Sequence, residues 1–356
     1  MPRALLVLLA TLAGKLLLSG ICLAADAPFT KLFSLAGAYP LGPSVNRTDY
    51  ESIDAAARRL YIAKMGDGQL LVFDLARNRL LAQLNGFPKI TGVLAVPEIH
   101  RVYASVPGGG VLSSLFVGLG MAGLSRGRGT VAVLDSESLR EIARVPGGVF
   151  PDGIAYDSKD RRVFVSDELG SALVVIDAIT NAPQARIAAD GEVGNVRYDP
   201  LTKRTYVPVQ SDNALAVIEP ADLRIVRRYN LPGCDHPHGF IVAPNAAVGL
   251  AACDGNDRLA VIDLATGRTL HVQPVAHDPD VLAIDAQSNR LYVAAESGNL
   301  SSFDIAHAEA PRALGDVYVG DGAHVVAVDP VSHQLYFALA DVNGRAVLMV
   351  LAPKSS

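Results

Sequence analysis

Short apolar runs that end in an acidic residue recur along the chain. They read LLVFD, VAVLD, LVVID, LAVIE, LAVID and LSSFD, and they end at Asp74, Asp135, Asp177, Glu219, Asp263 and Asp304. After a first interval of 61 residues, the acids follow one another every 41 to 44 residues. Short runs of Val, Ile and Leu are typical of buried strands, and a following acid suits a turn. The pattern therefore predicts a strand-based repeat.

A second pattern precedes most of these runs: an acid or proline, a few small or polar residues, and then an apolar-aromatic pair. Examples are IDAAARRLYIA, YDSKDRRVFVS, YDPLTKRTYVP, IDAQSNRLYVA and VDPVSHQLYFA. Asp, Asn and Pro favour tight turns, while Val, Tyr and Phe favour half-buried strands, so each example predicts an antiparallel hairpin. Seven such units occur, around Asp54, Pro97, Asp157, Asp199, Pro244, Asp285 and Asp329.

Each period thus holds a hairpin, a third strand that ends in the acid, and a fourth strand such as RIVRRYNL at 224–231. Four strands in about 42 residues are typical of one blade of a β-propeller. We therefore predict an all-β fold, a seven-bladed β-propeller of four-stranded antiparallel blades.

The two ends of the chain predict how the ring closes. After the seventh hairpin only AVLMVLA at 346–352 remains, so the last blade lacks a fourth strand. A spare strand, TKLFSL at 30–35, precedes the first unit. Pairing this N-terminal strand into the last blade would satisfy an open sheet edge.

The repeats resemble those of the YVTN-repeat propellers, whose strand signature is similar to RLYVA and RVFVS in this chain. The resemblance is to the YncE-type members in particular, through CDHPHGF at 234–240 and AACDGNDRLAVIDLATGR at 251–268. It covers nearly the whole chain after the N-terminal segment, and it implies the propeller fold. That family contains binding and surface proteins, and related propellers include lactonases and lyases, so the resemblance does not select an activity.

The N-terminal segment predicts a cleaved export signal over residues 1–25. Arg3 precedes an apolar stretch, and small residues follow it. Lys15 interrupts the stretch, which makes it a poor membrane span. We expect residues 26–356 to form a single propeller domain, periplasmic or secreted, with no transmembrane segment. The formal net charge of −5, without any block of Lys and Arg, argues against a nucleic-acid partner.

Histidines and acids gather in the loops that enter the first strand of each blade, where a propeller lines its axis. Counting back from the hairpin turns aligns Asp49, Thr91, Asp152, Gly194, His238, Asp280 and His324, which we call the ring positions. Two residues earlier lie Arg47, Lys89, Phe150, Glu192, His236, Asp278 and Gly322. From these we predict a ligand-binding funnel lined by Asp49, Arg47, Lys89, Asp152, Glu192, His236, His238, Asp278, Asp280 and His324.

Carboxylates and imidazoles around one narrow opening repel or compete for protons unless a cation lies among them. A single divalent metal would relieve this cost, and mixed imidazole and carboxylate ligands suit Zn, Mn or Fe. The predicted ligands are His238, Asp280, His324 and Asp152. Two alternatives remain open, because a metal-free funnel and a merely structural rim rich in Asp, His, Pro and Gly fit the same residues.

Two cysteines, Cys234 and Cys253, remain once a signal peptide containing Cys22 is removed. An even pair in an exported protein predicts a disulfide. Cys234 lies in the fifth entrance loop and Cys253 ends the second strand of that blade, so the bridge would hold the histidine loop in place.

The second blade exceeds the period through PGGGVLSSLFVGLGMAGLSRGRG at 107–129, between its second and third strands. We expect a loop insertion on the face of the entrance loops. Its apolar residues would cover the funnel as a lid, contact a membrane or partner protein, or pack on the propeller's own rim.

These observations support two classes of function. The first is an exported binding protein that takes a small ligand, a glycan or a protein at the funnel. The second is a metal-dependent hydrolase or lyase, similar to the lactonases, that uses the same funnel; its catalytic residues are not predicted. An electron-transfer quinoprotein is disfavoured, since the chain has no Trp and no CxxCH haem motif.

Overall fold

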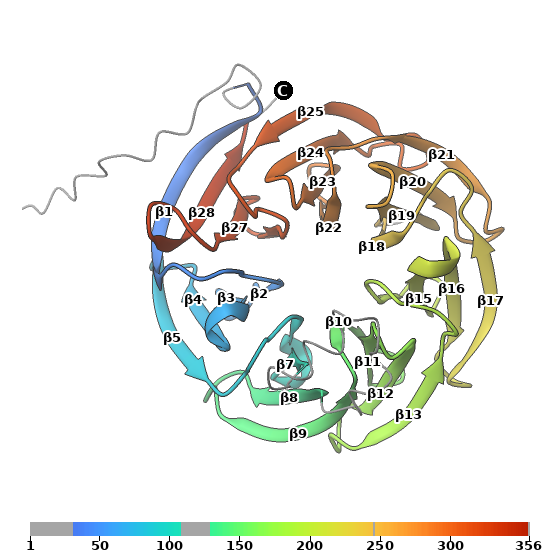
Figure 1. The fold of residues 1–356 in the computed structure, drawn as a ribbon, viewed down its shortest axis with the longest axis horizontal. Coiled ribbons are helices and arrows are strands. Elements are labelled where there is room, and N and C mark those ends of the chain that lie inside the picture. Colours follow the sequence, from blue (N-terminus) through green and yellow to red (C-terminus); the bar gives the residue numbers. More distant parts are fainter. Residues whose placement is uncertain (1–30, 108–128, 245, 355–356) are drawn as a thin grey trace, which may run out of the picture.

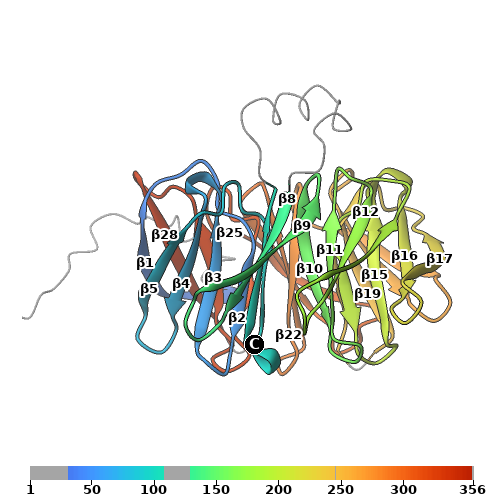
Figure 2. The same cartoon turned by 90° about the horizontal axis from the view of Figure 1, so that it is seen from below.

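The computed structural model describes residues 31–107, 129–244 and 246–354. Seven four-stranded antiparallel sheets stand in a ring around a central axis (Figures 1 and 2). This confirms the predicted all-β, seven-bladed β-propeller. In each blade the strands follow one another outward from the axis, so the first strand is the innermost.

The strand bounds follow the predicted repeat closely. Blade 1 contains β2 (Glu51–Asp54), β3 (Arg59–Lys64), β4 (Gln69–Asp74) and β5 (Arg79–Asn85). Blade 2 contains β6 (Val93–Val96), β7 (Arg101–Val106), β8 (Gly129–Asp135) and β9 (Glu141–Gly148). Blade 3 contains β10 (Pro151–Asp157), β11 (Arg162–Asp167), β12 (Ala172–Asp177) and β13 (Pro183–Ala188). Blade 4 contains β14 (Arg197–Asp199), β15 (Arg204–Val209), β16 (Ala214–Glu219) and β17 (Arg224–Asn230).

The remaining blades have the same order. Blade 5 contains β18 (Pro237–Val242), β19 (Val248–Cys253), β20 (Arg258–Asp263) and β21 (Thr269–Pro274). Blade 6 contains β22 (Pro279–Asp285), β23 (Arg290–Ala295), β24 (Asn299–Asp304) and β25 (Arg312–Tyr318). Blade 7 contains β26 (Ala327–Val328), β27 (Leu335–Leu339), β28 (Arg345–Pro353) and β1 (Phe33–Pro43). Short 3-10 segments, η1 (Met65–Asp67), η2 (Pro97–Ile99) and η4 (Gln210–Asp212), lie in turns.

The N-terminal strand closes the ring, as predicted, but its bounds differ from those expected. Strand β1 pairs antiparallel with β28 and starts at Phe33, three residues after the expected start, and runs on to Pro43 (Figure 1). The added part of the strand contains Gly and Pro, in AGAYPLGP at 36–43, which strands usually disfavour. They are tolerated because β1 is the outermost strand of its blade, and the pairing shifts between Leu35 and Gly37 and between Pro40 and Gly42.

The apolar core is divided among the seven junctions between neighbouring blades. In the described part of the chain, seven clusters of buried residues lie at these junctions, and the cluster between blades 1 and 2 also includes Val281 and Val325 of blades 6 and 7. The cluster between blades 7 and 1 contains Leu41 of β1 together with Leu60, Phe73 and Leu348. The closing strand therefore also contributes to the core at the seam of the ring.

The recurring acids form turns, as their regular spacing predicts. Asp74 accepts hydrogen bonds from the backbone N–H groups of Ala76 and Arg77, and Asp177 accepts them from Ile179 and Thr180. Hydrogen bonds of this kind lower the pKa of both carboxyl groups. These acids thus shape the blades and lie outside the candidate site.

Within the residues described, none of the helical segments has the length and apolar character needed to cross a membrane.

Candidate functional site

The entrance loops of neighbouring blades are joined at the ring positions. The backbone N–H of Asn195 donates to the carbonyl of His238 at 2.9 Å, and the N–H of Val281 approaches the carbonyl of His324 at 3.3 Å. Each of these hydrogen bonds joins the segment that enters one blade to the corresponding segment of the next blade. The ring positions of blades 4 to 7 therefore lie side by side around the axis.

Glycines permit this close approach. A Cβ atom on Gly92 would lie 2.0 Å from the carbonyl oxygen of Asp152, and one on Gly239 would lie 1.8 Å from that of Asp280. Both contacts are far shorter than van der Waals distance, so a side chain at either glycine would push neighbouring blades apart. The small residues that follow the ring positions thus set how tightly the loops converge.

Tyr50 fills the axis one residue beyond the ring positions. Its side chain is buried among apolar residues that include Val281 of blade 6 and Val325 of blade 7. Its hydroxyl donates to Oδ1 of Asn195 and lies 3.4 Å from Oδ2 of Asp152. Burial and the nearby Asp152 carboxyl raise the pKa of Tyr50 well above its usual range. Tyr50 therefore closes the inner end of the funnel, and we call its side chain the floor.

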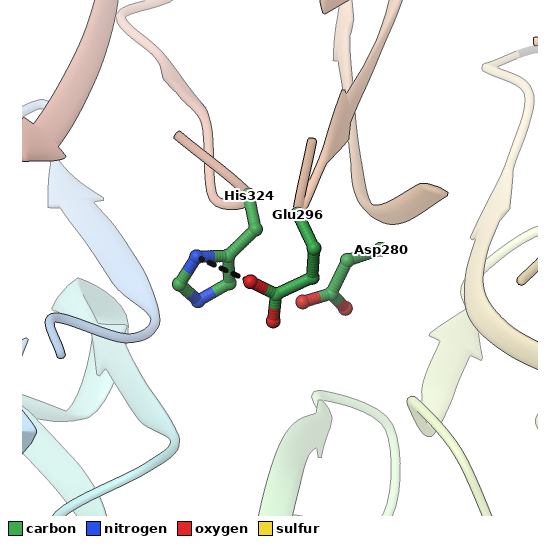
Figure 3. A group of neighbouring side chains, drawn as sticks. All are labelled: Asp280, Glu296 and His324. Carbon is green, nitrogen blue, oxygen red and sulfur yellow. Dashed lines mark ion pairs between the residues drawn. The ribbon is translucent and has the colours of Figure 1, made fainter. Parts of the chain in front are cut away.

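Three side chains above this floor form a group that could hold a metal ion: Asp280, Glu296 and His324 (Figure 3). One ligand atom from each lies within 4.8 Å of those of the other two. His324 is only 2% exposed, and its Nδ1 lies 2.9 Å from the carbonyl oxygen of Gly322. Burial by itself lowers the pKa of His324, but Asp49 and Asp280 outweigh it and raise the pKa to about 9. A bound cation would therefore displace the proton on Nε2, while Nδ1 keeps its proton and donates to Gly322, the arrangement found in metal-bound histidines.

Two buried polar atoms in this group lack hydrogen-bond partners. They are Oδ1 of Asp280 and Nε2 of His324. The nearest acid to His324 Nε2 is Asp49, whose Oδ1 lies 3.9 Å away, too far for a hydrogen bond. Buried polar atoms are rarely left without a partner, so this pair marks a place for a further ligand.

Arg47, in the entrance loop of blade 1, forms ion pairs with two acids at this site. Its Nη2 lies 2.7 Å from Oε1 of Glu296, and its Nε lies 3.6 Å from Oδ2 of Asp49. Glu296 Oε2 meanwhile lies 3.6 Å from Nδ1 of His324. The carboxylate of Glu296 is therefore oriented by a cation on one side and an imidazole on the other.

His238 lies beside this group in blade 5. Its Nε2 is 3.4 Å from Oδ1 of Asp280, and its Nδ1 is 3.1 Å from Oε1 of Gln210. Burial by itself lowers the pKa of His238, but Asp280, Glu168 and Asp152 outweigh it and raise the pKa to about 9. For the neighbouring acids, burial favours the uncharged form. It raises the pKa of Asp152 well above its usual range and also raises the pKa values of Glu168 and Asp280.

The outer layer of the funnel is more open. His236 is paired with Asp254 through Nδ1 at 2.7 Å, and its Nε2 lies 4.0 Å from Glu192. Asp278 and Lys89 are half-buried in the loops of blades 6 and 2. This layer forms a polar wall above the buried group.

The expected metal ligands therefore overlap only in part with the observed group. Asp280 and His324 belong to it, and Glu296 takes the third place. His238 contacts Asp280 from outside the group, while the carboxyl of Asp152 faces the hydroxyl of Tyr50 at the floor.

Glu296 was missed because the counting covered only the loops before the first strands. The residue after the second strand reaches the same face, since the N–H of Glu296 donates to the carbonyl of Asp278 at 2.8 Å. Equivalent bonds join the residues that follow β11, β15 and β19 to their own entrance loops; these residues are Glu168, Gln210 and Asp254. Their regular spacing in the sequence is the signal that could have identified Glu296.

The predicted disulfide between Cys234 and Cys253 is present, with their Cα atoms 5.3 Å apart. Cys253 pairs with Pro237 across β18 and β19, between His236 and His238. The bridge therefore ties the histidine loop to the second strand of its own blade.

The expected insertion at 107–129 falls largely outside the described residues, which end at Pro107 and resume at Gly129. Strands β7 and β8 end and begin at these points. Residues 123–127 of the insertion read GLSRG, the spacing of the G-x-S-x-G nucleophile elbow. That elbow belongs to a strand-to-helix turn of α/β hydrolases, a context that an all-β propeller does not supply.

Comparison with known proteins supports the fold. No family model matches the chain, and no curated protein matches it in sequence. A solved structure of hydrazine synthase from Kuenenia stuttgartiensis is similar, with a TM-score of 0.70 at 14% sequence identity. The match covers 89% of this chain and 97% of that chain. At such low identity the likeness shows the propeller fold alone.

Proposed function

We propose that this chain is an exported binding protein that takes a small ligand at the mouth of the axial funnel through one divalent cation. The observation that carries the proposal is the group Asp280, Glu296 and His324, in which buried Oδ1 and Nε2 atoms lack hydrogen-bond partners. A cation among them would provide those missing contacts and reduce the repulsion between the two carboxylates.

The donor set indicates which ions fit. One imidazole and two carboxylates suit Zn, Mn or Fe better than copper, which favours softer donors. Three protein donors leave coordination positions open, and a ligand carboxylate, hydroxyl or phosphate would take them. His238 and Arg47 lie beside the group and are placed to hydrogen-bond such a ligand.

A metal-dependent hydrolase or lyase is the second candidate, because open coordination positions are also typical of catalytic metal sites. In that case the bound ion would polarise a carbonyl group or activate water. The two candidates share the same three ligands and differ in whether a bound ester or lactone is turned over.

Export and the YncE-type resemblance belong to the same proposal. Disulfides persist mainly in oxidising compartments, so the bridge between Cys234 and Cys253 supports a periplasmic or secreted location. The apolar segment within residues 1–25 supports the same location. The seven-bladed fold is compatible with YVTN-repeat proteins, and the motif CDHPHGF remains the most specific resemblance.

The test is a titration of metal-stripped protein with Mn²⁺ and Zn²⁺ by calorimetry. We expect one site per chain, weakened at least about tenfold in Glu296→Gln and in His324→Gln, since each removes one ligand. Asp263→Asn is the matched control, because Asp263 ends β20 and accepts the backbone N–H groups of Ala265 and Thr266 in a turn outside the group.

Equal binding in wild type and both ligand variants would refute the metal site. Metal-loaded protein is then incubated with a panel of lactones and esters. Turnover that disappears in His324→Gln would select the enzyme over the binding protein.

A further inference from the structure

A second cavity lies on the axis beyond Tyr50, on the far side of the floor from the entrance loops. Its volume is about 220 Å³. The first strands of blades 1 to 4 supply its walls, because the chain runs from each ring position past Tyr50 into β2, β6, β10 and β14. The cavity is therefore distinct from the cation site, which blades 6 and 7 supply.

One wall of this cavity carries a cation without an acidic partner. Arg197 is half-buried there, and its Nη1 donates to the carbonyl oxygen of Val196 at 3.1 Å. Over the residues described, no carboxylate lies within ion-pair distance of the Arg197 guanidinium. The groups that act on its charge are Tyr50 and Asp152, and burial lowers its pKa.

A half-buried guanidinium that lines a cavity without an ion pair favours an anionic ligand over an empty space.

Most of the remaining lining is apolar and aromatic. Val93, Leu94, Ile154 and Ala155 contribute aliphatic surface, and Tyr198 adds a ring. The volume equals that of about seven water molecules in the liquid, enough for a small organic acid but not for a nucleotide or a sugar chain. Cavities with a mainly apolar lining and a few convergent polar groups are the usual sites of small ligands.

We propose that this cavity binds a small organic monocarboxylate, whose carboxylate pairs with the guanidinium of Arg197. The apolar part of the ligand lies against Val93 and Ile154. Arginine suits this role because its planar fork matches a carboxylate in two hydrogen bonds.

The experiment uses benzoate as the probe and measures its binding to the full chain by calorimetry, with the uncharged benzamide in parallel. We expect saturable benzoate binding, and at least about tenfold weaker binding of benzamide, because a charge-assisted hydrogen bond is lost. Arg197→Gln should weaken benzoate to the same extent.

Two controls separate this site from others. Arg162→Gln changes a half-buried arginine on β11 that does not line the cavity, and it should leave benzoate affinity unchanged. Glu296→Gln should also leave it unchanged, so failure of the cation site does not affect this test. A crystal soaked with 4-bromobenzoate should show the bromine signal inside the cavity.

Three results would overturn the proposal. These are the absence of saturable benzoate binding, equal binding of benzoate and benzamide, and loss of benzoate binding in Glu296→Gln with Arg197→Gln unaffected. The last result would place the anion at the entrance face.

Discussion

The ion pair between Arg58 and Asp329 joins the first and last blades at the seam of the ring. Arg58 lies in the turn between β2 and β3, and Asp329 follows β26. The two guanidinium nitrogens each lie 2.7 Å from a different oxygen of the carboxylate. The Asp329 side chain is completely buried, whereas that of Arg58 is 26% exposed. The pair is thus a two-point contact across the place where the chain closes on itself.

The magnitude follows from the pKa of Asp329. Burial by itself raises it, but hydrogen bonds from Arg58 and Ser332 outweigh burial and lower the pKa from 3.8 to about 2. A difference of one unit corresponds to about 1.4 kcal/mol, so the ionised carboxylate contributes about 2 kcal/mol to stability. Because the folded pKa is lower than the unfolded one, this contribution is complete above about pH 5. It is lost as the pH falls through 3.8 toward 2.

The perturbation is Arg58→Gln, and the assay is urea unfolding of both proteins from pH 7 down to pH 2.5. We expect the variant to be less stable at pH 7 by up to about 2 kcal/mol, since the hydrogen bonds from Ser332 and Val331 remain, with a gap that narrows below pH 4. Arg77→Gln is the control, because Arg77 pairs with the turn acid Asp74 but is 69% exposed. Exposed pairs contribute at most about 1 kcal/mol. A gap that does not change with pH, or an equal loss in the control, would refute the reasoning.

Three further predictions concern the axis and the histidine loop. Replacing Cys234 and Cys253 by Ala frees a loop with a sequence separation of 19 and should cost about 3 kcal/mol, read as a lower urea midpoint; an unchanged midpoint would contradict this. Gly239→Ala places a Cβ 1.8 Å from the Asp280 carbonyl and should cost at least about 2 kcal/mol in thermal unfolding, whereas wild-type stability would mean that the blades move apart freely. Tyr50→Phe removes the floor's hydroxyl donor and should cost about 1 to 2 kcal/mol, and a more stable variant would show that the hydroxyl is strained.

The blade count could be predicted from the sequence because one physical requirement repeats. Each turn acid, such as Asp177 or Asp285, accepts the backbone N–H groups of the turn that follows it. The end of β1 at Pro43 could not be predicted from the sequence. A strand tolerates Gly and Pro there only because it is the outermost strand of its blade, and that position exists only once the ring is closed.

The repeat also explains why the sequence predicted some residues of the candidate site and missed others. Counting along the repeat found Asp280 and His324, which lie in the same kind of loop. It did not find Glu296, which reaches the site from the end of β23. The role of Tyr50 was also missed, because a residue adjacent to a ring position becomes a floor only when the blades approach as closely as Gly92 and Gly239 allow.

The contrast between the turn acids and the ring positions agrees with the proposed ligand binding. The turn acids at the ends of the third strands are Asp in five blades and Glu219 in another, since these blades need the same kind of turn. The ring positions vary from Thr91 and Gly194 to Asp280 and His324, so the blade geometry does not require charge there. Charged groups buried where the fold does not need them cost stability, and such local conflicts are expected at functional sites. Experiments on the chemistry of this propeller should therefore target the ring positions and not the turn acids.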